Sequence, residues 1–176
     1  MRGRRVREAL GYCDKIRASE PLHGEPPAHR KPRVMQRRPD WQGVLDEFLR
    51  ANLNRPFEYG MWDCCLFVCD AIAAMTGVDL AASYRGKYST RTGALHAISE
   101  QLGTASILAV AANAAAAHHM PEVPVPHAHR GDMVLVARGR DHALGLVALN
   151  GMDVIVTSKR GLWRLPLSRA VRAWQV

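Results

Sequence analysis

The residues that most constrain this fold form a helix with a well-marked beginning and end, between Asp63 and Gly77. Asp63 is a typical N-cap residue, because its carboxylate can accept hydrogen bonds from the free amides of a first helical turn. Gly77 is a typical C′ residue, because glycine adopts the left-handed conformation that ends helices at little steric cost. Between them apolar residues recur at helical spacing and predict one inward-facing side. These residues are Cys64, Phe67, Val68, Ala71, Ile72 and Met75.

Cys64 falls in the first turn of this helix and on its inward-facing side. A helix N-terminus favours a negative charge by about 0.3–1 kcal/mol, which lowers a thiol pKa of about 8.5 by less than one unit. The neighbouring charge of Asp63 acts in the opposite direction. A thiolate at neutral pH therefore needs a histidine partner from elsewhere in the fold. Cys64 is a candidate nucleophile, and the alternative is an ordinary buried cysteine.

The positive charge of the chain lies at its N-terminal end. Residues 1–38 hold eleven of the 24 Lys and Arg and four of the 16 Asp and Glu, a net charge of +7, which leaves +1 for the other 138 residues. We expect residues 1–38 to be a mostly disordered basic arm, with a short helix around residues 6–16, and residues 39–176 to form one domain. The arm suggests contact with nucleic acid or an acidic partner. A solvated tail, or residues upstream of a start codon at Met35, is the interpretation we favour.

The start of the chain does not read as a secretory signal, and no segment is apolar enough to span a membrane. Four cysteines do not form a disulfide framework, which favours reduced thiols in a cytoplasm. Cys65 is expected to pack, and a metal site built from Cys64, Cys65 and Cys69 has poor zinc geometry. The histidines around the proline-rich stretch are expected in a solvated loop rather than at a metal; they are His118, His119, His127 and His129. No metal and no cofactor are predicted.

The pattern changes from helical to alternating along the chain. Helices are predicted over residues 41–53, with Asp40 as the cap, and over 64–76, 94–102 and 106–118. The intervening segment 78–93 is expected to be a loop, whose Tyr84–Tyr88 part lines a groove or an interface or is simply exposed. Prolines at 121, 124 and 126 predict an extended linker. Strands are predicted over 132–137, 143–149, 153–157 and 162–167, with a hairpin turn at Asn150-Gly151, and residues 173–176 close the domain. Helices followed by an antiparallel sheet indicate an α+β fold.

Several segments together resemble the NlpC-type cysteine peptidases, which are compact papain-like enzymes that cleave peptide bonds in bacterial peptidoglycan. The loop Pro56-Phe57-Glu58-Tyr59-Gly60 resembles the family's Pro-Tyr-x-x-Gly loop. Asp63-Cys64-Cys65-Leu66-Phe67-Val68 resembles its nucleophile motif, and Arg130-Gly131-Asp132 resembles the start of its first strand. The resemblance covers residues 39–176 and implies a papain-like domain with N-terminal helices packed on a C-terminal antiparallel sheet.

The resemblance implies a site in which Cys64 attacks a carbonyl and His142 is the general base. Aligning Gly145-Leu146 with the family's Gly-Ile places Ala143 at the histidine position, so His142 faces away from Cys64 unless a one-residue bulge at the strand entrance re-aims it. Thr157 is the nearest polar residue to the position that orients the histidine. The resemblance also implies substrate contacts at Phe57, Tyr59, Trp62 and Asp63, with Phe57 standing where the family has tyrosine.

A closer match is to a family of small phage and prophage proteins, usually regarded as distant relatives of these peptidases, whose genes lie among tail-assembly genes. Its shared residues include Tyr84-Arg85-Gly86-Lys87-Tyr88 and the terminal Ala173-Trp174. This resemblance implies a tail-associated cysteine hydrolase acting on peptide or amide bonds of peptidoglycan. The alternative is a catalytically inactive structural or assembly protein of the tail with the same fold. The implied partners are peptidoglycan or other tail proteins. The implied location is the cytoplasm, where the protein is made, and then the virion, where it is assembled into the tail.

Overall fold

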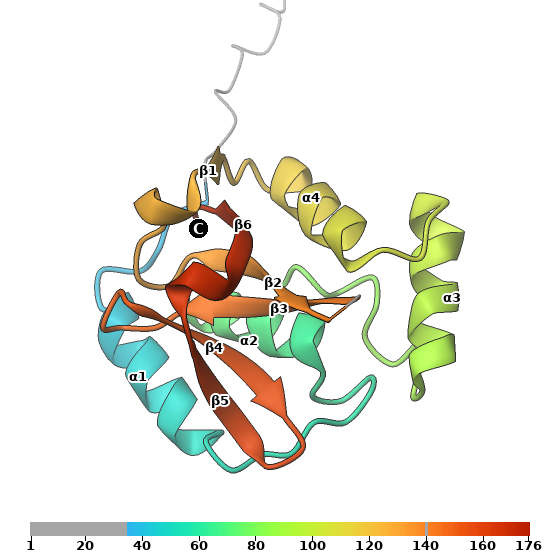
Figure 1. The fold of residues 1–176 in the computed structure, drawn as a ribbon, viewed down its shortest axis with the longest axis horizontal. Coiled ribbons are helices and arrows are strands. Elements are labelled where there is room, and N and C mark those ends of the chain that lie inside the picture. Colours follow the sequence, from blue (N-terminus) through green and yellow to red (C-terminus); the bar gives the residue numbers. More distant parts are fainter. Residues whose placement is uncertain (1–34, 140) are drawn as a thin grey trace, which may run out of the picture. The chain divides into compact units, whose positions relative to one another are not determined.

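A computed structural model describes residues 35–139 and 141–176 of the chain. Four helices come first along the chain and a six-stranded antiparallel sheet follows, which confirms the predicted α+β class (Figure 1). The predicted disorder of the arm and the helix predicted around residues 6–16 lie outside the described residues. None of the helices in the described ranges has both the length and the apolar character needed to cross a lipid bilayer.

The helices are α1 (Trp41–Ala51), α2 (Cys64–Thr76), α3 (Arg91–Leu102) and α4 (Ile107–Ala117). The predicted bounds of α2 are confirmed, with Asp63 as N-cap and Gly77 at a φ of 77° as C-cap. α3 begins three residues earlier than predicted, because the Thr90 hydroxyl caps it by accepting a hydrogen bond from the amide of Gly93.

The predicted cap of α1 is wrong. Asp40 makes no side-chain hydrogen bond to the helix, because its carboxylate accepts hydrogen bonds from the guanidinium of Arg38 instead. The helix also ends at Ala51, two residues before the predicted end. An acidic residue ahead of an apolar helix therefore does not always cap it. The side chain of Asp63 caps α2, whereas at Asp40 a nearby cation competes with the backbone amides for the carboxylate.

The sheet has the strand order β1-β6-β2-β3-β4-β5. Its strands are β1 (Glu122–Val123), β2 (Met133–Arg138), β3 (Asp141–Val147), β4 (Asp153–Ser158), β5 (Gly161–Pro166) and β6 (Ala170–Trp174). The predicted turn at Asn150-Gly151 joins β3 to β4, with Gly151 at a φ of 72°. The predicted extended linker contains β1, which pairs with β6. Short 3₁₀ helices follow at Val125–His127 and Leu167–Arg169.

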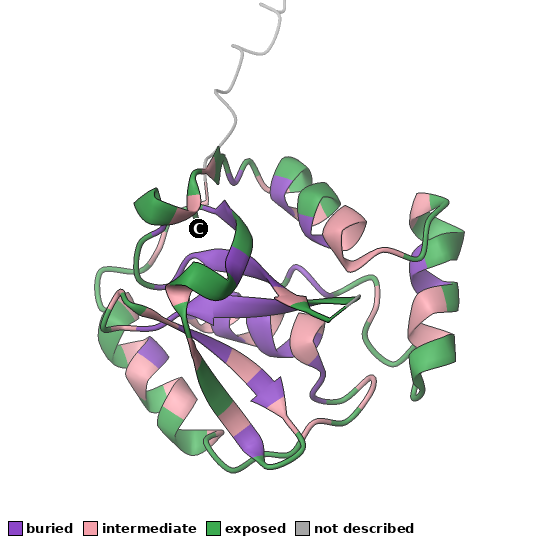
Figure 2. Ribbon diagram, in the orientation of Figure 1, coloured by how far each residue is buried: buried purple, intermediate pink, exposed green. Residues whose placement is uncertain are grey.

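The main core lies between α2 and the sheet. The inward residues of α2 from Phe67 to Met75 are buried, and they pack with buried residues of β2, β3 and β4 (Figure 2). The sheet residues of this cluster are Met133, Leu135, Leu144, Leu146 and Ile155, together with Trp174 of β6. A second apolar cluster, which includes Val134, Val136, Val147 and Val154, lies on the opposite face of the sheet. The alternation of side chains along β2 and β3 therefore assigns every other residue to the α2 side.

The folded domain begins before the predicted boundary at residue 39. The amide of Arg38 donates to the carbonyl of Met75 at 2.8 Å, and Met35 packs against the main core. Arg37, which the charge count placed in the arm, forms an ion pair of 2.5 Å with the fully buried Asp132 and lies over the ring of Trp41. The reason is electrostatic: burial raises the pKa of Asp132, and a buried carboxylate needs a counter-charge.

We predict that Arg37→Met lowers the free energy of unfolding by about 3 kcal/mol, because it leaves the buried Asp132 carboxylate without its counter-charge. Urea denaturation measures the change. Arg38→Met is the matched control, since Arg38 pairs with an exposed Asp40 and its loss should cost less than about 1 kcal/mol. Equal losses in the two variants would contradict the assignment of Arg37 to the folded domain.

Candidate active site

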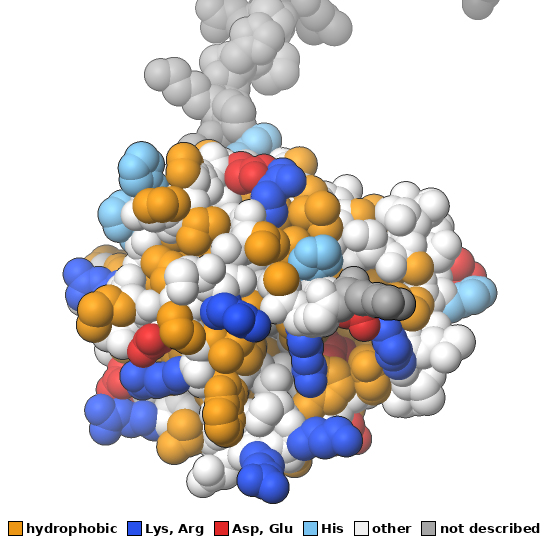
Figure 3. All heavy atoms as spheres, in the orientation of Figure 1, with side chains coloured by type: hydrophobic (Ala, Val, Ile, Leu, Met, Phe, Trp, Pro, Cys, Tyr) orange, Lys and Arg blue, Asp and Glu red, His pale blue; other side chains and the backbone are white. Residues whose placement is uncertain are grey.

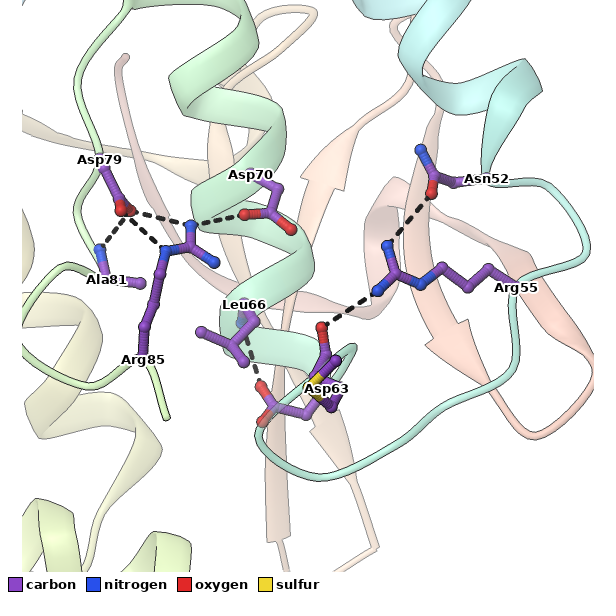
Figure 4. A network of polar contacts seen from close by, with 9 residues as sticks. Asn52, Arg55, Asp63, Leu66, Asp70, Asp79, Ala81 and Arg85 are labelled. Carbon is purple, nitrogen blue, oxygen red and sulfur yellow. Dashed lines mark hydrogen bonds and ion pairs between the residues drawn. The ribbon is translucent and has the colours of Figure 1, made fainter. Parts of the chain in front are cut away.

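Asp63 holds the start of α2 through four hydrogen bonds, of which Figure 4 shows the one from the amide of Leu66. One carboxylate oxygen accepts from the backbone amides of Cys65 and Leu66, both at 3.0 Å. The other accepts from the amide of Gly60 at 3.1 Å and from the hydroxyl of Tyr88 at 2.6 Å. The side chain is buried, so these four donors replace the water that a carboxylate would otherwise bind. The first turn of the helix is thereby fixed to two loops.

The loop before α2 is pressed against the segment 84–88 at a single glycine. Gly60 has a φ of 74°, and a Cβ there would lie 1.8 Å from the backbone oxygen of Tyr88, so no larger residue fits. Burial, and then the hydrogen bond to Asp63, raise the pKa of the Tyr88 phenol. Arg85 in the same segment forms ion pairs with Asp70 in α2 and with Asp79, which follows the helix (Figure 4). These ion pairs hold the segment against α2. The segment thus supports the helix N-terminus, in addition to its exposed surface.

Cys64 is partly buried, and its thiol pKa is lowered. The largest cause is a hydrogen bond with the side chain of Cys65, and the backbone amide of Leu144 adds another. Burial and the charge of Asp63 act in the opposite direction. The environment therefore favours a thiolate, but through a thiol and backbone amides rather than through an imidazole.

The contact with Leu144 depends on where two strands separate. The ladder between β3 and β4 pairs Leu146 with Ile155 and Val147 with Val154. Ahead of these pairs, the amide of Leu144 bonds the sulfur of Cys64. The amide of Leu144 therefore bonds the sulfur outside the β3–β4 pairs.

Cys65 and Cys69 lie on another side of α2 and line a mainly apolar cavity of about 170 Å³, which we call the Cys65 cavity. The hydrogen bond to Cys64 and burial raise the pKa of Cys65, and burial raises the pKa of Cys69 to about 12. Both thiols are therefore protonated at neutral pH. Within residues 35–139 and 141–176, no group of three or more His, Cys, Asp or Glu side chains is arranged to hold a metal ion.

Cys64 itself lines a larger cavity of about 570 Å³, which we call the Cys64 cavity. Its walls come from the loop before α2, from α3, from the start of α4 and from the end of the β2–β3 hairpin. Four of the predicted site residues meet there: Phe57, Tyr59, Cys64 and His142. Of the described histidines, His142 alone lines this cavity.

His142 lies on the side of β3 that faces α2, and no bulge is needed to bring it there. The β2–β3 register runs without a shift from Met133 opposite Leu146 to Arg138 opposite Asp141. His142 therefore alternates in phase with Leu144 and Leu146, which belong to the α2 cluster. The expectation that His142 faces away from Cys64 unless a bulge re-aims it is therefore wrong, because the unshifted strand already turns His142 toward the α2 side. The ring is exposed, and no hydrogen bond joins it to Cys64 in the described structure.

Thr157 faces α2 from β4, two residues beyond Ile155. Extending the β3–β4 register by two residues brings it level with Leu144 rather than with His142. Its side chain is 5% exposed, and its hydroxyl has no hydrogen-bond partner among the described residues. The hydrogen bond that was expected to orient His142 is therefore not formed in this structure.

The four expected substrate contacts divide into two pairs. Phe57 and Tyr59 line the Cys64 cavity, with their rings edge to face at 4.8 Å. Trp62 is 1% exposed and packs between Phe67, Phe48 and the guanidinium of Arg55, so it belongs to the core. Asp63 is buried with four donors and positions α2. Trp62 and Asp63 are thus corrected from substrate contacts to structural roles.

Sequence reasoning missed the charged residues of the Cys64 cavity. Arg91 at the start of α3 and Asp141 at the start of β3 form an ion pair of 2.8 Å, and Arg138 lies opposite Asp141 at the end of the hairpin. Arg91 comes from a part of the chain far from the hairpin that holds Arg138 and Asp141, and none of the three belongs to a local motif. Only the packing of α3 against the hairpin brings them to Cys64.

The fold and this site can now be set beside known protein families. The profile of a family described as Domain of unknown function (DUF6950) matches residues 36–176. The match covers most of the chain, and the chain belongs to this family. Its start at residue 36 agrees with the domain boundary that Arg37 defines. Among curated proteins no match to the chain was found.

We predict that Tyr88→Phe lowers the free energy of unfolding by about 2 kcal/mol, because it removes a hydrogen bond to a buried carboxylate. Thermal or urea denaturation measures the loss. Tyr84→Phe is the control in the same segment, since no hydrogen bond from its hydroxyl is found in the described structure. A loss below about 0.5 kcal/mol at position 88 would mean that Asp63 does not depend on Tyr88.

We also predict that Thr157→Val raises the free energy of unfolding by about 1 kcal/mol, because it replaces an unpartnered buried hydroxyl by a methyl group. Thr76→Val is the matched control: the Thr76 hydroxyl donates to the carbonyl of Ile72 at 2.7 Å, so its loss should destabilise the domain. Destabilisation at position 157 as large as that at position 76 would reveal a hydrogen bond to Thr157.

Proposed function

We propose that the chain is a cysteine hydrolase of the NlpC type, in which Cys64 is the nucleophile and His142 is the general base. The observation that carries the proposal is the Cys64 cavity. There, the thiol at the capped start of α2 and one histidine from β3 line the same space. A lowered thiol pKa supports the assignment of the nucleophile, because the thiolate is the attacking species.

The proposed reaction follows the chemistry of acyl transfer through a thioester. His142 takes the proton of Cys64, and the thiolate adds to a peptide or amide carbonyl. The tetrahedral intermediate collapses with release of the amine, which takes its proton from His142. Water, activated by His142, then hydrolyses the thioester. His142 stands exposed at the end of β3, so rotation about its side-chain bonds would bring its ring toward the sulfur.

The resemblance to NlpC-type peptidases supplies the proposed substrate and setting. The substrate is a stem peptide of peptidoglycan, and the protein acts in a phage or prophage tail, after synthesis in the cytoplasm. The size of the Cys64 cavity, about 570 Å³, is within the range of small-ligand sites and would admit a few residues of such a peptide.

The second candidate is a structural or assembly protein of the tail with the same fold and no catalysis. A specific observation favours it: in the described structure no hydrogen bond joins Cys64 to an imidazole, and the Thr157 hydroxyl orients no histidine. In this candidate the hydrogen bonds to Cys64 only fix the position of the start of α2, and the lowered thiol pKa is a side effect of them.

Alkylation of Cys64 by iodoacetamide, followed against pH by mass spectrometry, separates the two candidates. Because hydrogen bonds lower the thiol pKa, the reaction curve of the wild type should lie below the free-thiol value of about 8.5. For the hydrolase we expect an apparent pKa near or below about 7, and a rise of about one unit in His142→Ala. His96→Ala, an exposed histidine on α3 beside Glu100, is the control and should change nothing.

Two outcomes would overturn the hydrolase. An apparent pKa near 8.5 in both the wild type and His142→Ala would leave a passive thiol and the structural candidate. A low apparent pKa that does not respond to His142→Ala would assign the lowered value to Cys65 and remove His142 as the base. With the expected response, release of new amino groups from peptidoglycan peptides by the wild type, and not by Cys64→Ala, completes the test.

A further inference from the structure

We infer that the Cys64 cavity selects substrates that carry a carboxylate, and that Arg138 is the residue that recognises it. This inference rests on the proposed role of Cys64 as the reacting group and names the chemical class of its substrate. It begins from the charges that line the cavity, which come from three side chains: Arg91, Arg138 and Asp141.

These charges do not cancel. Arg91 and Asp141 form an ion pair of 2.8 Å, which neutralises both. Arg138 lies opposite Asp141 on the neighbouring strand and forms no ion pair with any described residue. The wall of the cavity at the end of the hairpin therefore carries one uncompensated guanidinium. On the face drawn in Figure 3, Lys and Arg side chains also outnumber Asp and Glu.

Two other acids are next in sequence to residues that line the cavity: Glu58, between Phe57 and Tyr59, and Asp63, before Cys64. Glu58 is exposed and does not line the cavity. Asp63 does not line it either. The Asp63 carboxylate is buried, and four hydrogen-bond donors stabilise its charge. Asp63 raises the thiol pKa, but it offers no surface to a ligand. The charge that a ligand meets is therefore positive.

The backbone adds to this positive potential. Cys64 is the first residue of α2, and Ser106 and Ile107, the cap and first residue of α4, line the same cavity. The N-terminal end of a helix carries a partial positive charge. Two helix starts and one unpaired arginine thus face a single space, and the hydrogen-bonding fork of a guanidinium matches a carboxylate.

The rest of the wall is suited to the body of an acyl or peptide substrate. Phe57 and Tyr59 line it from the loop before α2, and Leu95 and Ile98 line it from α3. A ligand with a carboxylate at Arg138 would lay its uncharged part along these side chains, with its reactive carbonyl toward Cys64. A neutral ligand of the same shape would lose the interaction with Arg138.

Two alkylating reagents of nearly equal size test this selectivity directly, because iodoacetate carries a carboxylate and iodoacetamide does not. The measured quantity is the ratio of their rates at Cys64, divided by the same ratio for N-acetylcysteinamide, a neutral model thiol. At low ionic strength we expect the normalised ratio to be about fivefold above one, and to fall toward one as salt screens the charge. Fragment-ion mass spectrometry assigns the label to Cys64 rather than to Cys65.

Variants locate the effect. Arg138→Gln should lower the normalised ratio to near one, and Arg138→Lys should retain most of it. Arg160→Gln, which removes an exposed charge between β4 and β5 outside the cavity, is the control and should leave the ratio unchanged. The iodoacetamide rate is measured in every variant, so that the ratio is independent of any change in the ionisation of the thiol itself.

A normalised ratio near one in the wild type, or a raised ratio that Arg138→Gln does not reduce, would overturn the inference. Either result leaves the pH profile with iodoacetamide intact, so the hydrolase proposal would still stand. Conversely, a thiol of ordinary pKa still reacts at pH 8.5, where the rate ratio can be measured even if the hydrolase proposal fails.

Discussion

The carboxylate of Asp63 is the interaction on which the site depends. It caps α2, and it also binds the amide of Gly60 and the hydroxyl of Tyr88, so one buried charge joins the helix to the loops on either side. The same contacts decide where Cys64 stands, because it is the next residue and begins the helix. The arrangement carries an electrostatic cost, since a fixed negative charge beside a thiol opposes its ionisation. Four donors on the carboxylate, and the hydrogen bonds to the sulfur from Cys65 and from the backbone, offset that cost.

The second determinant is the parting of β3 from β4. Where their ladder ends, the amide of Leu144 becomes available to the sulfur, and the cavity opens between α3, α4 and the hairpin. His142 stands two residues earlier on the same face of β3. The geometry thus provides a thiol and a histidine that line one cavity, while the Thr157 hydroxyl has no hydrogen-bond partner among the described residues. This combination leaves a hydrolase and a structural relative as the two candidates, and the response of the thiol pKa to His142→Ala distinguishes them.

The chain also illustrates how far local patterns carry a prediction. The bounds of α2 and the turn at Asn150-Gly151 were predicted correctly, because caps and turns depend on residues close in sequence. Asp40 looked like the same kind of cap, and Arg38 took its carboxylate instead. The side of β3 on which His142 lies was predicted wrongly, because it was inferred from aligning Gly145-Leu146 with the family's Gly-Ile pair. In the fold, α2 buries Leu144 and Leu146, and the alternation of side chains along the strand then places His142 on the same side.

By itself, the sequence determined the α+β class, the capped helix and the residue that begins it, since hydrophobic periodicity and capping act within a few residues. Only the tertiary structure decided that Arg37 is the counter-charge of Asp132, that Trp62 is core, and that Arg138 and His142 share a cavity with Cys64. Those facts depend on pairings between distant segments. A buried charge or an open cavity exists only once the segments around it have packed.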